Sequence, residues 1–216
     1  SVISTISSSL KIKKEMNILD DKEFYEALQS INKTSEHLSN TIDDFRNFFS
    51  PNKEMNKFYV SQLIKKSKDL IKSRFDKFNI KVIENIDDIE ILSYQNELFQ
   101  VILNLFSNSI DVLSSNEIED KIIHIKIYQD ENNLCIEFLD NGGGIKDEFI
   151  NRVFEPYFTT KHKSQGTGIG LYMSLQIVTK HLNGEISVKN DTFIENNIAY
   201  FGAKFTILLP IHPKNS

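Results

Sequence analysis

The sequence is poor in the features that mark secreted and membrane-spanning proteins. Its single cysteine, Cys135, excludes an internal disulfide, is typical of a reducing compartment and falls in an apolar strand pattern. No apolar run approaches the ~20 residues that a membrane-spanning helix needs, and no secretory leader is visible. Because the chain begins at Ser1 rather than at a methionine, we expect the cytoplasmic portion of a longer protein, which is itself soluble or membrane-anchored.

The sequence also lacks a large excess of either positive or negative charge. The 25 basic and 30 acidic residues are interspersed, the net charge is −5, and no basic face stands out that would bind nucleic acid. The chain has 216 residues, of which 40% are hydrophobic, so it can form one ordinary domain and a smaller element. We therefore expect a folded protein whose partners are not nucleic acids.

Residues 1–52 have the periodicity of helices. The second of two helices carries a heptad seam, which predicts packing in a bundle. The seam positions are Phe24, Leu28, Ile31, Ser35, Leu38, Ile42, Phe45 and Phe49. A polar break with an N-cap at residues 17–21 separates this helix from an earlier one, and Pro51 stops it. One apolar seam per helix predicts that two antiparallel hairpins pair in a homodimer.

Residues 53–216 have the pattern of an α+β domain. A helix with one buried face is predicted first, and longer helical patterns span residues 98–113 and 170–181. The face of the first helix comprises Leu63, Ser67, Leu70, Ile71, Phe75 and Phe78. Strands are predicted at residues 80–86, 89–92, 123–127, 134–138, 185–188 and 204–209. Helices on one face of a mixed sheet would bury these apolar faces.

The glycines are concentrated in two places. Six of the eight glycines fall in residues 140–144, directly after a predicted strand, and in residues 166–170, directly before a predicted helix. Glycine admits positive φ and a close approach to a ligand, and free N–H groups at a helix start suit phosphate. A tight turn would explain either cluster alone. The second cluster lacks the Gly-Lys-Ser/Thr of a Walker loop.

A polar stripe marks the helix predicted at residues 98–113. Asn104 and Asn108 lie four residues apart and share one face, and Asp111 follows one turn later. Such a stripe on an apolar helix indicates either a buried hydrogen-bond network or oxygen ligation of Mg²⁺. Between the glycine clusters, residues 154–161 carry three aromatic rings around Pro156, which suits core anchors or a mobile lid.

In this order, the motifs resemble the ATP-binding domain of sensor histidine kinases in the GHKL superfamily. Residues 98–113, which contain Asn104 and Asn108, resemble the N box, 140–145 the first glycine box, 154–161 the F box and 166–171 the second glycine box. Residues 1–52 are similar to the dimerisation and histidine-phosphotransfer hairpin of that family. The resemblance implies a two-layer α/β sandwich preceded by an antiparallel helical hairpin, with ATP and Mg²⁺ as cofactors and a response-regulator receiver domain as partner.

The resemblance also implies roles for individual residues. Asn108 would coordinate Mg²⁺ with support from Asn104, and Asp140 would accept a hydrogen bond from the adenine amino group. Lys161 is a candidate cation for the phosphates, and Asp111 stands where many relatives have a basic residue. The further positions implied to contact the nucleotide are Gly142, Gly144, Ile145, Phe158, Thr160, Gly166, Thr167, Gly168, Ile169, Gly170 and Leu171.

The acceptor histidine of the family is missing from the sequence. Its pattern, His-x-x-Arg-x-Pro, does not occur, and His37 lies on the wrong helix for that role. We therefore expect the histidine to lie upstream of Ser1, so that this chain cannot phosphorylate itself. The alternatives are a nucleotide-binding regulatory or dimerisation module without kinase activity, and the ATPase branch of the superfamily. The latter uses a glutamate base at the position of Asn104, and an amide cannot accept that proton.

Overall fold

The computed structural model describes residues 2–48, 54–160 and 167–211, and for residues 2, 33 and 36–48 it describes the backbone alone. The chain forms two units. The smaller comprises Ser1–Pro51 and Tyr157–Ile169, and the larger comprises Asn52–Pro156 and Gly170–Ser216. Within the described ranges, every helix is too short or too polar to cross a membrane. The predicted domain boundary between residues 52 and 53 lies outside these ranges.

The smaller unit contains the predicted helical hairpin. Helix α1 spans Val2–Glu15 and α2 spans Asp21–Phe48, so the predicted break between them is confirmed. Asp20 caps α2, because its Oδ1 accepts a hydrogen bond from the Glu23 N–H at 2.7 Å. Lys13 at the end of α1 forms an ion pair with Glu23. For the seam positions predicted between residues 38 and 49, the structure does not describe the side chains.

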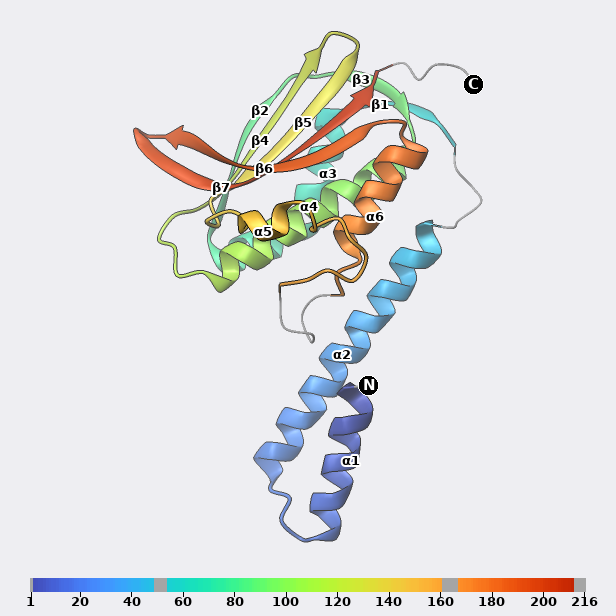
Figure 1. Cartoon of the computed structure of the whole chain (residues 1–216), viewed down its shortest axis with the longest axis vertical. Coiled ribbons are helices and arrows are strands. Elements are labelled where there is room, and N and C mark those ends of the chain that lie inside the picture. The colour runs from blue at the N-terminus through green and yellow to red at the C-terminus, as the bar shows by residue number, and fades with distance from the viewer. Residues whose placement is uncertain (1, 49–53, 161–166, 212–216) are drawn as a thin grey trace. The chain divides into compact units, whose positions relative to one another are not determined.

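The larger unit is built on a five-stranded mixed sheet in the order β2-β4-β5-β7-β6 (Figure 1). Strands β2 and β4 are parallel, and the other neighbours are antiparallel. The strands are β2 (Ile80–Ile86), β4 (Lys121–Asp130), β5 (Asn133–Asp140), β6 (Glu185–Glu195) and β7 (Ile198–Pro210). A separate antiparallel pair joins β1 (Asn56–Tyr59) to β3 (Glu90–Ser93). Neither β1 nor the short α5 (Asp147–Ile150) was indicated by the sequence pattern.

Helices lie on one face of this sheet, as predicted (Figure 1). They are α3 (Val60–Phe78), α4 (Gln95–Ser115) and α6 (Gly170–Gln176), the last continued by the π-helical η1 (Ile177–His181). Parallel β2 and β4 require a crossover, and α4 lies within it. The rings of Phe75, Phe106 and Phe138 stack edge to face at 5.4 and 5.0 Å, so they join α3, α4 and β5 in one core.

One residue of the face predicted for α3 is exposed. Leu63, Ser67 and Phe75 are buried as expected, but the Leu70 side chain is 63% exposed. A step of seven residues falls about 20° short of two full turns of an α-helix, so a heptad count drifts across the helix surface. Leu63 already lies at one margin of the buried stripe, and the drift carries Leu70 beyond it.

Strands β6 and β7 are longer than predicted. The sequence indicated strands at 185–188 and 204–209, but the two strands pair from Glu185 with Leu208 out to Glu195 with Ile198. Their outer part pairs only with each other, because β5 pairs with β7 no further than Leu139 with Lys204. Asn196 and Asn197 have φ values of 51° and 63°, which is the conformation of a tight hairpin turn. We call residues 190–203 the ribbon.

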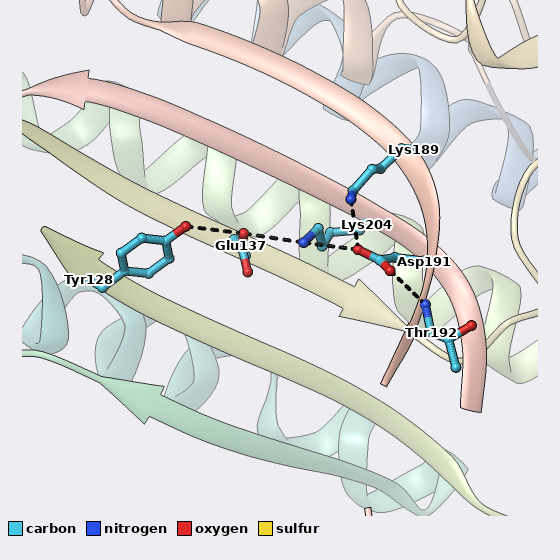
Figure 2. A network of polar contacts seen from close by, with 6 residues as sticks. All are labelled: Tyr128, Glu137, Lys189, Asp191, Thr192 and Lys204. Carbon is cyan, nitrogen blue, oxygen red and sulfur yellow. Dashed lines mark hydrogen bonds and ion pairs between the residues drawn. The ribbon is translucent and has the colours of Figure 1, made fainter. Parts of the chain in front are cut away.

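The sheet face opposite the helices carries a network of charged side chains (Figure 2). The Lys204 ammonium lies 3.3 Å from Glu137 Oε1 and 3.0 Å from Asp191 Oδ2. Asp191 also contacts Lys189 at 3.0 Å, and the Tyr128 hydroxyl donates to Glu137 at 3.4 Å. Cys135, on β5 like Glu137, is 2% exposed and is therefore a small core residue.

Candidate functional site

Helix α4 places the predicted Asn104 against α6. The Asn104 carboxamide donates from Nδ2 to the hydroxyl of Ser174 on α6 at 2.8 Å, and Ser174 is 2% exposed. A Cβ at Gly170 would lie 2.4 Å from Asn104 Oδ1, closer than any side chain allows. Gly170, the first residue of α6, therefore contacts the Asn104 side chain directly. This contact brings the N box and the end of the second glycine box together.

The same helix contacts the end of β5, where Asp140 is 4% exposed. The Ser109 hydroxyl donates to Asp140 Oδ2 at 3.2 Å, and the Gly142 N–H donates to Oδ1 at 2.9 Å. Burial raises the pKa of the Asp140 carboxyl, although hydrogen bonds from Gly142, Ala203 and Ser109 oppose that rise. This carboxylate is held in a defined orientation in a poorly solvated position, which is a common property of functional carboxylates.

The loop of residues 142–145, which we call the first glycine loop, leaves β5 in a conformation that needs glycine. Gly143 and Gly144 have φ values of 89° and 79°. A Cβ at Gly142 would lie 2.3 Å from Val112 Cγ1 on α4, so this loop packs directly on the helix. Asn116, at the C-cap of α4, donates to the Gly142 carbonyl at 2.9 Å.

Asn141, which precedes this loop, is turned into the protein. It is 6% exposed, its Oδ1 accepts the Ile122 N–H at 2.8 Å, and its Nδ2 donates to the Asp120 carbonyl at 2.6 Å. These bonds attach the start of the first glycine loop to the start of β4. Asn141 is therefore structural, in contrast to Asp140 beside it.

The Asn108 side chain differs from its neighbours on α4. Its Nδ2 is buried and, in the part of the chain that the structure describes, no atom accepts a hydrogen bond from it. An unsatisfied buried donor costs on the order of 1–3 kcal/mol, so such atoms are uncommon without a functional reason. The amide is thus not committed to a protein partner, and its oxygen belongs to the class of hard donors that Mg²⁺ prefers.

Asp111 has a cation beside it that the sequence did not reveal. Arg74 on α3 donates to Asp111 Oδ1 at 2.8 Å and to the Ser107 hydroxyl at 2.9 Å. The guanidinium therefore offsets the negative charge that Asp111 places one turn beyond Asn108. Sequence reasoning could not find Arg74, because it lies 37 residues from Asp111 and on another helix.

The described residues 157–160 and 167–169 belong to the smaller unit. The Tyr157 N–H donates to the Gly168 carbonyl at 2.9 Å, and Gly168 has φ 66° and no room for a Cβ beside Phe158. The Ile169 N–H donates to the Thr167 hydroxyl at 3.3 Å. Thr160 is exposed, whereas Phe158 and Leu171 are half-buried. The predicted residues Lys161 and Gly166 lie outside the described ranges.

Among the residues that the structure describes, a metal site made of protein side chains alone is not found. Across the described ranges, no group of three or more His, Cys, Asp and Glu side chains could hold a metal ion. A magnesium ion that uses few protein ligands does not require such a group, because Mg²⁺ commonly takes one or two protein oxygens together with phosphates and water. The uncommitted Asn108 amide fits that kind of site.

Comparison with known proteins agrees with this arrangement. Residues 93–213 match the family of histidine kinase-, DNA gyrase B- and HSP90-like ATPases. Sporulation kinase E of Bacillus subtilis (strain 168) is 32% identical over 155 residues, which are 71% of this chain and 19% of that protein. The chain thus spans about a fifth of this curated relative.

Solved structures show the same fold. The catalytic domain of histidine kinase ThkA superimposes with a TM-score of 0.61 at 25% identity, covering 74% of this chain and 97% of that one. Histidine kinase ThkA in complex with response regulator protein TrrA gives a TM-score of 0.74 at 22% identity, covering 100% of this chain and 59% of that one.

The fold and the arrangement around α4 thus define an ATP-binding α/β sandwich of the GHKL class. The chain belongs to the histidine kinase-, DNA gyrase B- and HSP90-like ATPases, and it is a catalytic domain of the type found in two-component sensor kinases. The predicted fold class and the predicted resemblance are both confirmed.

Proposed function

We propose that this chain is the part of a two-component sensor histidine kinase that binds ATP·Mg²⁺ and delivers its γ-phosphoryl group to a histidine. The observation that carries the proposal is the position of α4. Its Asn104 contacts the start of α6, its Ser109 contacts Asp140, and its Asn108 amide has an unpaired buried donor. One helix therefore joins a carboxylate, two glycine turns and an uncommitted amide.

In this proposal Asp140 accepts a hydrogen bond from the adenine amino group. Gly142, Gly144 and Ile145 leave room for the nucleotide, and the backbone N–H groups around Gly168 and Gly170 bind phosphate oxygens. The remaining predicted residues, Phe158, Thr160, Lys161, Gly166, Thr167, Ile169 and Leu171, complete the contacts to the nucleotide. Each side chain thus positions the nucleotide or stabilises its charge.

Asn108, supported by Asn104, is the proposed protein ligand of Mg²⁺. When bound, Mg²⁺ neutralises phosphate charge and orients the triphosphate. Asp111 is proposed to lie beside the phosphates together with Arg74, whose guanidinium already compensates its charge. Asn104 carries an amide, which cannot accept a proton from an attacking water, and this disfavours ATP hydrolysis as the main reaction.

The chemical step that these residues would support is transfer of a phosphoryl group. A neutral imidazole nitrogen of the acceptor histidine attacks the γ-phosphorus, the N–P bond forms, and the bond to the β,γ-bridging oxygen breaks. The electron pair of that bond leaves with ADP, and the imidazole proton is lost to solvent. Catalysis of this kind depends on positioning and charge neutralisation more than on a protein acid or base.

Two partners belong to the proposal. A response-regulator receiver domain would accept the phosphoryl group from the histidine, in keeping with the complex of ThkA with TrrA. A second copy of the chain would pair through the hairpin, because Phe24 and Leu28 of the seam are 39% and 38% exposed. Ile12 and Met16 on α1, exposed by 55% and 63%, would be covered in the same interface.

Calorimetry with ATP and MgCl₂ on the 216-residue chain tests the nucleotide site. We expect wild-type protein to bind ATP·Mg²⁺, and Asn108→Ala to lose the contribution of Mg²⁺ to affinity, about tenfold or more. Asn85→Ala, at an exposed position on β2, is the matched control and should bind as wild type does. Equal affinity of wild type and Asn108→Ala with and without Mg²⁺ would exclude Asn108 as the ligand.

A labelling experiment distinguishes the kinase from a regulatory nucleotide-binding module. With γ-³²P-labelled ATP, we expect no label on this chain, since none of its histidines lies in a His-x-x-Arg-x-Pro pattern. We expect acid-labile label on an added helical hairpin that carries such a pattern. If ATP binds but the added hairpin is never labelled, the module without kinase activity becomes the better assignment.

A further inference from the structure

The first glycine loop is held by a side chain that lies outside all four sequence motifs. Asn190 on β6 accepts the Ile145 N–H through Oδ1 at 2.8 Å and donates from Nδ2 to the Ile145 carbonyl at 2.7 Å. Two such bonds to one residue are the pairing that a neighbouring antiparallel strand would make. The carboxamide of Asn190 thus makes the two hydrogen bonds to the loop that a neighbouring strand would otherwise make.

The contact with Asn190 is also close sterically. A Cβ at Gly144 would lie 2.6 Å from Asn190 Oδ1 and 2.9 Å from Phe201 Cε1. The Gly143 N–H donates to the Phe201 carbonyl at 3.3 Å. The ribbon therefore supports the first glycine loop along its length, and Asn190 makes the only side-chain bonds to Ile145 within the described residues.

We infer that Asn190 is a positioning residue of the nucleotide site. It holds the first glycine loop in the shape that receives the nucleotide, and it does so through Ile145 and Gly144 rather than by touching the ligand. This inference rests on the proposed function, in which that loop borders the adenine nucleotide. It assigns to the ribbon the role of support for the site.

The consequence of losing this contact should be seen in affinity. Gly143 and Gly144 have positive φ, so this stretch has wide conformational freedom once its external partner is gone. A nucleotide that needs one shape then binds with its affinity reduced by the fraction of chains that have it. Asn190 lies half-buried on the edge strand of the sheet, so the core packing of the domain does not depend on it.

The test uses Asn190→Ala in the full chain, with ADP and, separately, tripolyphosphate as ligands in the presence of MgCl₂. We expect ADP affinity to fall about tenfold and tripolyphosphate affinity to stay within about twofold, because the loop borders the base rather than the phosphates. The control Gln129→Ala removes a comparable bond, from Nε2 to the Glu131 carbonyl at 2.8 Å, in the distant β4–β5 turn. It should bind both ligands as wild type does.

Amide hydrogen exchange without nucleotide supplies the readout that separates this inference from the proposed function. The Ile145 amide should be protected in wild type and Gln129→Ala and should exchange at least tenfold faster in Asn190→Ala. The isosteric Asn190→Asp, which keeps the acceptor and loses the donor, should retain Ile145 amide protection and still weaken ADP at least threefold. It replaces the alanine variant if that variant does not fold.

Three results would overturn the inference. The first is unchanged ADP affinity in Asn190→Ala, and the second is an equal loss of ADP and tripolyphosphate, which indicates a general structural defect. The third is failure of wild-type protein to bind ADP, which overturns the proposed function as well. In that last case the exchange data still report whether Asn190 holds Ile145, so the two failures are distinguishable.

Discussion

Asp140 combines a buried carboxylate with an orientation fixed by Ser109 and Gly142. Burial raises its pKa, so in the range between its ordinary pKa and the raised value the native protein holds a proton that the unfolded chain has lost. Stability due to this group is therefore fully present at low pH and decreases as pH rises through that range. The charged Asp140 carboxylate therefore lowers the stability of the fold at neutral pH. Such a group is expected where function requires its charge.

We predict that ADP binding depends on the ionisation of Asp140. A protonated carboxyl is a weaker acceptor for the adenine amino group, so wild-type affinity should weaken as pH is lowered from about 8 toward the raised pKa. Asp140→Asn should bind ADP at least about tenfold more weakly at neutral pH, and without that pH dependence. Calorimetry at several pH values, with thermal unfolding of each sample as a control for folding, measures both effects. A variant with the pH profile of wild type would contradict the role of Asp140.

At the scale of elements, the sheet is stabilised differently on its two faces. The helical face is apolar, with Ile123, Ile125 and Ile136 all 0% exposed. The opposite face has the network around Lys204, which is 16% exposed and lies between two carboxylates (Figure 2). Hydrogen bonds from Lys189 and Lys204 lower the pKa of Asp191 to about 2. The network therefore ties β6 to β7 and β5 by charge.

We predict that this network makes the domain sensitive to acid. Because the folded-state pKa of Asp191 is depressed from 3.8 to about 2, its contribution is present above pH ~4 and is lost as pH falls through that range. Solvent screens the pair, so we expect Asp191→Asn to lower the unfolding free energy by about 1 kcal/mol at neutral pH. The difference from wild type should shrink toward zero near pH ~2.

Urea unfolding at neutral and acidic pH measures this effect. Asp130→Asn, an exposed position at the end of β4, is the control and should leave the unfolding free energy within about 0.5 kcal/mol of wild type. A loss in Asp191→Asn that is equally large at acidic and neutral pH would show that the ion pairs are not its cause.

At the scale of the whole molecule, regular patterns were predictable and contacts between distant residues were not. Strand β2 was predicted at its observed limits, because it is a short run rich in the β-branched residues Ile and Val. The ribbon was missed because its apolar residues follow no regular alternation and its two strands pair only with each other. Asn190 gave no signal, since one asparagine in a strand does not indicate that a loop 45 residues away needs two hydrogen bonds.

In the candidate site, too, local sequence patterns were predictable and contacts between distant residues were not. Glycine clusters and the Asn104 and Asn108 pair stand out in the sequence because their spacing is local. The residues that fix the site became visible only in the structure. Ser174 bonds Asn104, Asn116 bonds Gly142, and Arg74 bonds Asp111. Sequence thus predicted the groups proposed to touch the ligand, and structure added the groups that fix their geometry.

We predict that the hairpin makes the chain a dimer and that its seam is the interface. Phe24→Glu should place a charge in that interface and raise the dimer dissociation constant about a hundredfold or more. Tyr25→Glu, beside it but off the seam and 66% exposed, is the matched control. Light scattering over a wide concentration range measures both. A wild-type chain that stays monomeric throughout would contradict the prediction.

The single buried thiol has a practical consequence for measuring distances between sites on this chain. Cys135 is 2% exposed and burial raises the pKa of its thiol, so the reactive thiolate is scarce in the folded chain. Maleimide dyes or spin labels should therefore attach selectively to cysteines introduced on the surface, with no need to remove the native one. Interdomain distances could then be followed by fluorescence transfer or electron resonance as nucleotide is added.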